Sequence, residues 1–543
     1  MFSVHSIQNS TMQSFGNKVR NMTHLGQPSI EIKLNNSSYG VHSNYVVSYS
    51  TMDTIEGTVS ITANHDTRFE EVEIAFMGTA QVYVDRLTTT PSMSGRTEAN
   101  HRFLTLKQPI ADSQLPTPRV LESGRTYELP FTFTVPAQLL PRSCPHGVNN
   151  DSVRDSHLQL PPSMGDPELA GHGGSLLDDL APEMSKIVYG IKVRLTQLRE
   201  TDNSLSLLAS QFKKVRVKPA HEEQPPINFD PSNGEYRLRM EKNVKKGLFK
   251  GKLGTLTAQS AQPKALMIPG ARTTNDSPIA TKAKIVLRFD PKEETILPPR
   301  LSTLSSKIRV STYYASAPRH DIPTRSALGF DLTQGVYQEN VTLSSLCIAS
   351  ASWVKHASCA SPQPDDNYVV RRDSGMSGLS ATSYTENEKH SAFTAGILTA
   401  SPNYKGGAFY TAAIHVPVTL PTNKNFLPTF HSCLISRVYA LSLHVAAKTP
   451  SGSNANVYLK VPVQIAAEGS EMGNENARAR SAEVRGAREA DAIFSPRSVA
   501  PPSLPPFSQG QDEADLPPPD YVQVAGQVGR RGQREGQRVS ITA

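Results

Sequence analysis

Apolar and polar residues alternate with a period of two along most of this chain. Ile30–Leu34, Gly57–Ile61 and Val72–Phe76 each follow that pattern. Because successive side chains of a β-strand face opposite sides of a sheet, each segment predicts a strand with one buried face. Further alternating segments follow, separated by turns rich in Gly, Asn and Pro. Short strands joined by such turns are typical of antiparallel β-sandwiches, so the sequence predicts an all-β fold.

The two halves of the chain end in similar patterns. The first half closes with an alternating segment that begins at Tyr189, followed by a strand through Val215 and Val217. The second half closes with an alternating segment that begins at Tyr439, followed by Val457–Ile465. This internal repeat predicts two tandem immunoglobulin-type sandwiches of one design rather than two unrelated domains.

Proline-rich and polar segments mark the boundaries of the predicted domains. Pro225, Pro226 and Pro231 fall in a stretch suited to a linker. The sequence predicts a flexible N-terminus (1–27), an N-terminal sandwich (28–218) and a linker (219–231). A C-terminal sandwich (232–467) and a disordered tail (468–543) follow. Two polar insertions, 141–185 and 357–395, are predicted to be long loops within the sandwiches. The tail has too few apolar residues to offset the entropy lost on ordering it.

Composition narrows the classes of partner. Apolar residues make up 37% of the 543 residues, which suffices for packed domains that carry polar loops or tails. Lys and Arg number 56 against 49 Asp and Glu, an excess of 7 that is mild for this length. Weak contact with an anionic membrane is compatible with that excess. The arginines between Arg530 and Arg538 lack interleaved aromatic residues, so the sequence predicts no nucleic-acid binding.

Targeting and cysteine patterns predict a cytoplasmic location. Residues 1–20 lack the apolar core of a signal peptide. The longest apolar stretch, Cys433–Ala447, is interrupted by Arg437 and His444 and is too short to span a membrane. The four cysteines lie far apart and form no Cys-x-x-Cys pair, which argues against both a disulfide scaffold and a structural zinc site.

Motifs of the common catalytic classes are absent from the sequence. The chain contains no Gly-x-Ser-x-Gly elbow, phosphate-binding loop or His-Glu-x-x-His, so we expect no catalytic residue and no cofactor. His172-Gly173-Gly174 resembles half of an esterase loop but lacks a matching serine, and a flexible loop explains it better. His146, His157 and His172 share the first insertion with Cys144. Their spacing matches no zinc finger, so we interpret them as polar loop residues, with a metal site as the alternative.

Two short patterns are candidate binding or regulatory sites. A basic cluster around Leu248 and Phe249 consists of Lys242, Lys245, Lys246, Lys250 and Lys252. These lysines either protect an exposed strand edge, which is the favoured interpretation, or form a patch for an acidic partner or phospholipid. Separately, Arg371-Arg372-Asp373-Ser374 has the form of a basophilic kinase site, so Ser374 is a candidate for phosphorylation.

The predicted tail carries a peptide motif with defined chemistry. Pro518-Pro519-Asp520-Tyr521 matches the Pro-Pro-x-Tyr ligand of WW domains. Consecutive prolines hold a polyproline II helix before binding, so little entropy is lost on binding. Pro518 and Pro519 fill an aromatic groove, while Tyr521 supplies a second anchor with a hydroxyl group. The motif therefore predicts a WW-domain partner.

Several segments of the body occur in an ordered series. Ile55–Ile61 and then Phe69–Gly78 open the N-terminal half, and His157–Ser163 lies in its insertion. In the C-terminal half, Cys433–Tyr439 precedes the closing segment Leu459–Val463. Together with the Pro-Pro-x-Tyr motif, these segments resemble the α-arrestins, the arrestin-related trafficking adaptors of fungi.

The resemblance, over roughly residues 28–467, implies a fold and a function. It implies two tandem arrestin-like β-sandwiches joined by a short hinge, which bind membrane transporters or receptors as cargo. It also implies recruitment of a HECT-type ubiquitin ligase through its WW domains, followed by ubiquitination and endocytosis of the cargo. Such an adaptor is expected to be cytoplasmic, non-enzymatic, and recruited to the plasma membrane or endosomes. The alternative is an arrestin-fold cargo-sorting scaffold, of the retromer-subunit type, without a ubiquitin-ligase role.

Overall fold

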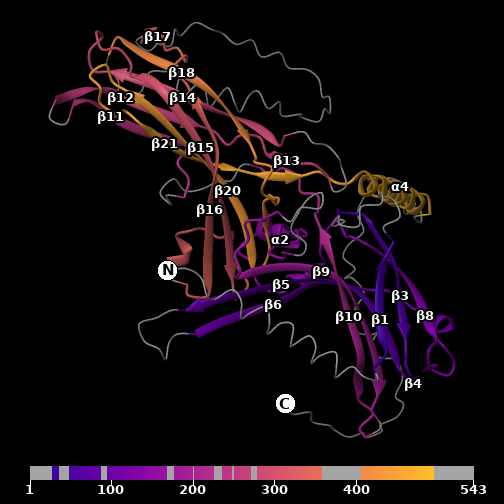
Figure 1. Cartoon of the computed structure of the whole chain (residues 1–543). Coiled ribbons are helices and arrows are strands. Elements are labelled where there is room, and N and C mark those ends of the chain that lie inside the picture. The colour runs from indigo at the N-terminus through magenta and orange to yellow at the C-terminus, as the bar shows by residue number, and fades with distance from the viewer. Residues whose placement is uncertain are drawn as a thin grey trace, which may run out of the picture. The chain divides into compact units, whose positions relative to one another are not determined.

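Two β-sandwiches contain most of the regular structure of the chain (Figure 1). The structure is a computed structural model. It describes residues 27–35, 48–86, 95–167, 177–199, 201–225, 235–247, 250–270, 278–329, 331–357, 404 and 406–494. Residues 1–482 form one compact unit, which holds both sandwiches, and residues 483–543 form a second unit. The all-β fold predicted from the alternation is confirmed.

The N sandwich, at residues 29–217, packs a sheet in the order β1-β3-β8 against a sheet in the order β2-β10-β9-β5-β6. Its strands are β1 Ser29–Leu34, β2 Ser48–Tyr49, β3 Thr54–Thr62, β5 Glu71–Arg86, β6 Gly95–Lys107, β8 Thr126–Thr134, β9 Ser185–Leu198 and β10 Leu205–Val217. A small ribbon of β4 (Thr67–Arg68) and β7 (Val120–Leu121) and the 3-10 helix η2 (Asp112–Gln114) complete it. Neighbouring strands are antiparallel except β2 and β10, which are parallel.

The sequence alternation places one face of each of these sheets in a shared core. Ile55, Gly57, Val59 and Ile61 of β3 are buried, while the residues that alternate with them are more exposed. Phe76 of β5 and Phe133 of β8 come from opposite sheets, and their ring centroids lie 6.0 Å apart. Aromatic contact across the two sheets shows that their apolar faces meet, as in a sandwich.

The C sandwich, at residues 239–467, packs a sheet in the order β11-β12-β14-β18-β17 against a sheet in the order β16-β15-β20-β19, with β21 also paired to β20. Its strands are β11 Arg239–Gly247, β12 Lys250–Ser260, β14 Ala280–Pro291, β15 Arg300–Ala315, β16 Gln334–Cys347, β17 Val354–Ala357, β18 Ala408–Thr419, β19 Phe430–His431, β20 Ile435–Lys448 and β21 Val457–Val463. Strands β13 (Leu266–Ile268) and β22 (Ile465–Ala467) pair in parallel, and the 3-10 helix η5 (Ala327–Gly329) precedes β16.

The closing strands of the two sandwiches share one design, as the internal repeat predicts. β9 pairs with β10 and β20 pairs with β21, in both cases antiparallel. Tyr189 on β9 is buried, and its hydroxyl donates to the carbonyl oxygen of Pro161 at 2.6 Å. Tyr439 on β20 is also buried, and its hydroxyl donates to the carbonyl oxygen of Leu427 at 2.7 Å. Each tyrosine thus anchors an irregular segment to the core, because a buried hydroxyl needs a partner.

The insertion at 141–185 is more structured than the predicted long loop. It contains the 3-10 helix η3 (Pro141–Ser143) and the helix α2 (Asp151–Leu158). The side chain of Asn150 accepts a hydrogen bond from the backbone N of Val153 at 2.9 Å, which caps the start of α2. Val153, His157 and Leu158 are buried and hold the helix against the sandwich. The loop prediction is therefore wrong for these two segments.

The predicted tail also begins with regular structure. Helix α4 occupies Glu471–Phe494, where disorder was predicted from residue 468. Ser470 caps this helix by accepting a hydrogen bond from Gly473 N at 2.9 Å, and its hydroxyl donates to the buried carboxylate of Asp53. The amide of Asn476 donates to the carbonyl oxygen of Met52 at 2.9 Å. The start of α4 is therefore attached to the N sandwich. Among the described residues, no helix is both long and apolar enough to cross a membrane.

Candidate functional site

The two sandwiches exchange apolar side chains at their interface. Leu180, from the insertion of the N sandwich, is 1% exposed and belongs to the core cluster of the C sandwich. In return, Leu427, Phe430 and Leu434 of the C sandwich join the core cluster of the N sandwich. Separating the sandwiches would expose these side chains to water, so their burial couples the two domains.

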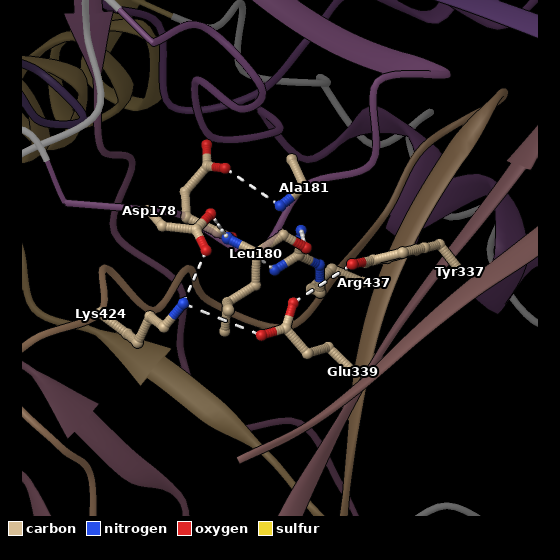
Figure 2. Close-up of polar contacts among 8 residues, drawn as sticks. Asp178, Leu180, Ala181, Tyr337, Glu339, Lys424 and Arg437 are labelled. Carbon is tan, nitrogen blue, oxygen red and sulfur yellow. Dashed lines mark hydrogen bonds and ion pairs between the residues drawn. The ribbon is translucent and has the colours of Figure 1, made fainter. Parts of the chain in front are cut away.

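Arg437 is a charged side chain enclosed at this interface (Figure 2). It lies on β20 and is 0% exposed. Its Nη1 donates to the carbonyl oxygen of Asp179 at 3.0 Å, and its Nη2 donates to that of Leu180 at 3.2 Å. Nη2 also lies 3.4 Å from the Sδ of Met164. A different packing of the sandwiches that kept Arg437 buried would leave its charge and two carbonyl groups without partners, so these contacts favour one arrangement.

The segment that contains Leu180 is a turn held by two carboxylates. Asp178 Oδ1 accepts from Leu180 N at 2.8 Å, and Asp179 accepts from Ala181 N at 3.1 Å and from Gly165 N at 2.7 Å. Leu180 has a φ of 58°, in the left-handed region that residues other than glycine rarely adopt. The hydrogen bonds of the turn and the burial of the leucine together hold this backbone conformation.

Lys424 links the turn to the C sandwich through ion pairs. Its Nζ lies 2.7 Å from Asp178 Oδ2 and 3.8 Å from Glu339 Oε1, and Tyr337 donates to Glu339 Oε2 at 3.3 Å (Figure 2). Burial works to raise the pKa of Asp178, but the hydrogen bonds from Lys424 and Leu180 outweigh it and hold that pKa below its ordinary value. Asp178 and Lys424 are partly exposed, so water weakens their attraction and the ion pair contributes modestly.

A cluster of four sulfur and nitrogen ligands lies at the same interface. The donor atoms of Cys144, His146, His157 and Cys433 all lie within 4.8 Å of one another. Cys144 Sγ is 3.3 Å from His146 Nε2 and 3.7 Å from His157 Nδ1. Both cysteines are free of disulfide bonds and buried, as is His157. We call these four residues the Cys₂His₂ cluster.

Burial shifts the pKa of two members of the Cys₂His₂ cluster, His157 and Cys433, toward their neutral forms. Burial lowers the pKa of His157 to about 4, and the charges of His146 and Arg319 add to that effect. Burial raises the pKa of Cys433 to about 12, and the neighbouring Cys144 adds to that effect. The sequence groups Cys144, His146 and His157, with polar loop residues as the favoured interpretation and a metal site as the alternative. Cys433 is not part of that group, because it reaches the other three only through packing of the C sandwich on the N sandwich.

The basic cluster predicted from sequence lies on the hairpin of β11 and β12. β11 is an edge strand of its sheet, and Lys245, Lys246 and Lys252 are exposed. Lys242 is half-buried and donates to the carbonyl oxygen of Asn456 at 3.1 Å. Lys250 is the first residue of β12, and its side chain lies outside the described part of the structure. The placement agrees with lysines that protect a strand edge, while contact with an acidic partner or lipid stays a prediction.

The remaining predicted site residues lie outside the described residues. They are Pro518, Pro519 and Tyr521 of the WW-domain motif, Ser374 of the kinase motif, and His172 of the insertion. WW-domain binding and phosphorylation therefore stay predictions.

Comparison with known families bears on the N sandwich. Residues 42–204 match the family described as "Arrestin (or S-antigen), N-terminal domain". The chain is arrestin-like. The matched range runs from β2 to β9. It includes the turn around Leu180, which contacts Arg437. A search of curated proteins found no match. An arrestin domain indicates the role of an adaptor or scaffold.

Proposed function

We propose that this arrestin-like chain is a non-enzymatic adaptor of the fungal α-arrestin type. Its body binds plasma-membrane transporters or receptors, and its tail recruits a WW-domain HECT-type ubiquitin ligase to them. The cargo is then ubiquitinated and enters endocytosis. The observation that carries this proposal is the arrestin N-terminal domain at residues 42–204, in a chain that also contains Pro518-Pro519-Asp520-Tyr521.

The two sandwiches supply the cargo-binding arm in this proposal. They are joined by buried apolar side chains and by Arg437, so cargo would meet one composite surface rather than two loose domains. The exposed Lys245, Lys246 and Lys252 support weak contact of this body with an anionic membrane. The adaptor would therefore be cytoplasmic and move to the plasma membrane or endosomes when it binds cargo.

The Pro-Pro-x-Tyr motif supplies the ligase-binding arm. Pro518 and Pro519 limit the entropy lost on binding, and Tyr521 adds an aromatic anchor. Asp512, Glu513 and Asp515 lie just upstream and would steer the encounter with a basic groove.

A direct binding measurement tests this arm. The full chain should bind a purified WW domain of a HECT-type ligase, and Tyr521→Ala should abolish that binding because it removes the second anchor. Phe507→Ala is the matched control, since Phe507 also follows two prolines in the tail but without the Pro-Pro-x-Tyr spacing. The control should bind like the unchanged chain. Unchanged binding by Tyr521→Ala would refute the ligase-binding arm.

Cargo ubiquitination separates this proposal from the sorting-scaffold alternative. If cargo ubiquitination depends on the chain and is lost with Tyr521→Ala, the ligase adaptor is supported. If the chain sorts cargo equally well with and without Tyr521, a scaffold of the retromer-subunit type is the better description.

A further inference from the structure

The Cys₂His₂ cluster is made of ligands that suit one class of metal ion. Two thiols and two imidazoles meet without any carboxylate in the set. Calcium and magnesium prefer oxygen ligands, whereas two sulfurs and two nitrogens in a tetrahedral arrangement are typical of Zn²⁺. Four protein ligands leave no open position for a substrate, which marks a structural rather than a catalytic site.

The distances within the cluster are close to those of a tetrahedral zinc site. Zn–S bonds of ~2.3 Å and Zn–N bonds of ~2.0 Å place a sulfur and a nitrogen ~3.5 Å apart and two sulfurs ~3.8 Å apart. The Sγ of Cys144 lies 3.3 Å from His146 Nε2 and 3.7 Å from His157 Nδ1. The other separations are at most 4.8 Å, so small rotations of the side chains suffice to bring the four atoms around one ion.

Neighbouring groups orient His146 as a ligand. Its Nδ1 lies 3.0 Å from the carbonyl oxygen of Gly147, and Nδ1 of His320 lies 2.7 Å from the same oxygen. A carbonyl oxygen only accepts, so each of these Nδ1 atoms carries a proton. When Nδ1 carries the only proton of the His146 ring, the lone pair of Nε2 faces Cys144. Hydrogen bonding of the outer ring nitrogen to a backbone carbonyl is a common feature of metal-bound histidine.

The local backbone also fixes the other ligands. Cys144 follows η3, where Ser143 Oγ donates to the carbonyl oxygen of Phe103 at 2.7 Å. His157 is in the last turn of α2, on its buried side. Cys433 lies between β19 and β20, and the carbonyl oxygen of Cys433 accepts from the backbone N of Arg319 at 3.0 Å. The four ligands are thus presented by ordered segments.

We propose that Cys144, His146, His157 and Cys433 bind one structural Zn²⁺ ion that cross-links the two sandwiches. Three ligands come from the insertion of the N sandwich and the fourth from the C sandwich. The ion joins segments that are distant in sequence, so it holds the sandwiches in the arrangement that Arg437 and Leu180 also favour. This inference does not depend on the proposed ligase recruitment.

Zinc content of the purified full chain is the first test. Elemental analysis of protein prepared under reducing conditions without chelator should find about one zinc ion per chain. Cys144→Ser and Cys433→Ser should each lose most of that zinc, whereas Cys347→Ser, which changes an exposed cysteine outside the cluster, should retain it. Absence of zinc from the unchanged chain, or full zinc content in both cluster variants, would overturn the proposal.

A cysteine variant could lose zinc because it misfolds, so two further measurements use the unchanged chain. Replacement of zinc by Co²⁺ should give the visible absorption of a tetrahedral site with thiolate ligands, and octahedral spectra would contradict the site. Alkylation and mass spectrometry under the same conditions should find Cys144 and Cys433 protected by the metal and released together by chelator. A disulfide between these two cysteines in zinc-free protein would overturn the proposal in favour of a covalent link.

The thermal unfolding temperature tests whether the ion stabilises the folded chain as a cross-link. Chelation should lower the thermal unfolding temperature of the unchanged chain, because an ion bound only by the folded state stabilises it. The same chelator should leave the unfolding temperature of folded Cys433→Ser unchanged. An equal decrease in both proteins would show that the chelator acts elsewhere and would contradict the cross-link.

Discussion

Arg437 shows that the role of a single residue at the interface can differ from the role that its sequence context suggests. Arg437 interrupts an apolar stretch, and from sequence it argues against a membrane span. In the structure the same arginine is fully buried and donates to the carbonyl oxygens of Asp179 and Leu180. Charged residues are rarely buried without partners, so a buried arginine identifies where two surfaces must fit together.

Replacing Arg437 tests that role. Arg437→Met removes two hydrogen bonds and leaves two buried carbonyl groups unpaired, while it also removes the cost of burying a charge. We expect a net loss of about 1–3 kcal/mol in the free energy of unfolding, measured by denaturant titration. Arg300→Met changes an exposed arginine at the start of β15 and should have little effect. Equal stability of both variants would mean that Arg437 does not hold the interface.

Replacing Leu180 by glycine has two opposing effects on the free energy of unfolding. Leu180→Gly relieves a left-handed backbone, worth about 1–2 kcal/mol, but deletes a buried side chain, which costs about 2–5 kcal/mol. Loss of the buried side chain should dominate, so the variant should be less stable in denaturant titration. A variant as stable as the unchanged chain would show that backbone strain offsets the whole of that burial.

The buried carboxylate of Asp166 predicts a pH dependence. Its Oδ2 lies 3.2 Å from Lys186 Nζ and 2.9 Å from Lys214 Nζ. Burial works to raise the pKa of Asp166, but the two lysines outweigh it and hold the pKa below its ordinary value. A lowered folded-state pKa contributes stability above the unfolded pKa of about 4, and that stability is lost as pH falls through the folded pKa.

Asp166→Asn should therefore be less stable than the unchanged chain at pH 7, by about 1–3 kcal/mol. Unfolding measured from pH 7 to pH 3 should show the difference shrinking toward acid, since protonation neutralises the carboxylate in the unchanged chain as well. Glu122→Gln, at an exposed ion pair with Arg125, should show no comparable difference. A difference for Asp166→Asn that stays constant with pH would contradict this assignment.

At the scale of elements, alternation predicted strands with a well-buried face, including the edge strand β1, and missed β6 and β16. The segments at Gly57–Ile61 and Val72–Phe76 lie in β3 and β5, which have neighbours on both sides. β6 and β16 lie at sheet edges, and the residues of β16 are all half-buried or exposed. A strand without a fully buried face does not need strict alternation, so its sequence carries little periodic signal.

Helix α4 was missed for a different reason, because it is polar. Its start is held by Ser470 and Asp53 rather than by a large apolar face. Ser470→Ala should cost about 1–2 kcal/mol through the lost cap and increase hydrogen exchange in residues 471–482. Ser481→Ala, which removes a local bond to the carbonyl oxygen of Ala477 on the same helix, should leave that exchange nearly unchanged. Equal exchange in the two variants would show that Ser470 does not anchor the helix.

At the scale of the whole molecule, the contacts between sandwiches could not be predicted from sequence. Arg437 and Cys433 meet the insertion of the N sandwich only because two domains pack together. Local patterns describe strands and motifs, whereas such contacts depend on which faces of distant segments meet. The same limit applies to the proposed cargo surface, which would combine residues from separate strands and would have no linear motif. The Pro-Pro-x-Tyr motif is contiguous in sequence, so it could be predicted without knowledge of the fold.

We propose that one chain joins a ubiquitin ligase to membrane cargo. The most direct measurement is quantitative affinity capture from membrane extracts with the full chain and with Tyr521→Ala side by side. We expect both proteins to capture the same transporters or receptors, and only the unchanged chain to capture a WW-domain HECT-type ligase. Captured cargo should carry less ubiquitin with Tyr521→Ala. Equal ligase capture and equal cargo ubiquitination by the two proteins would contradict the proposed function.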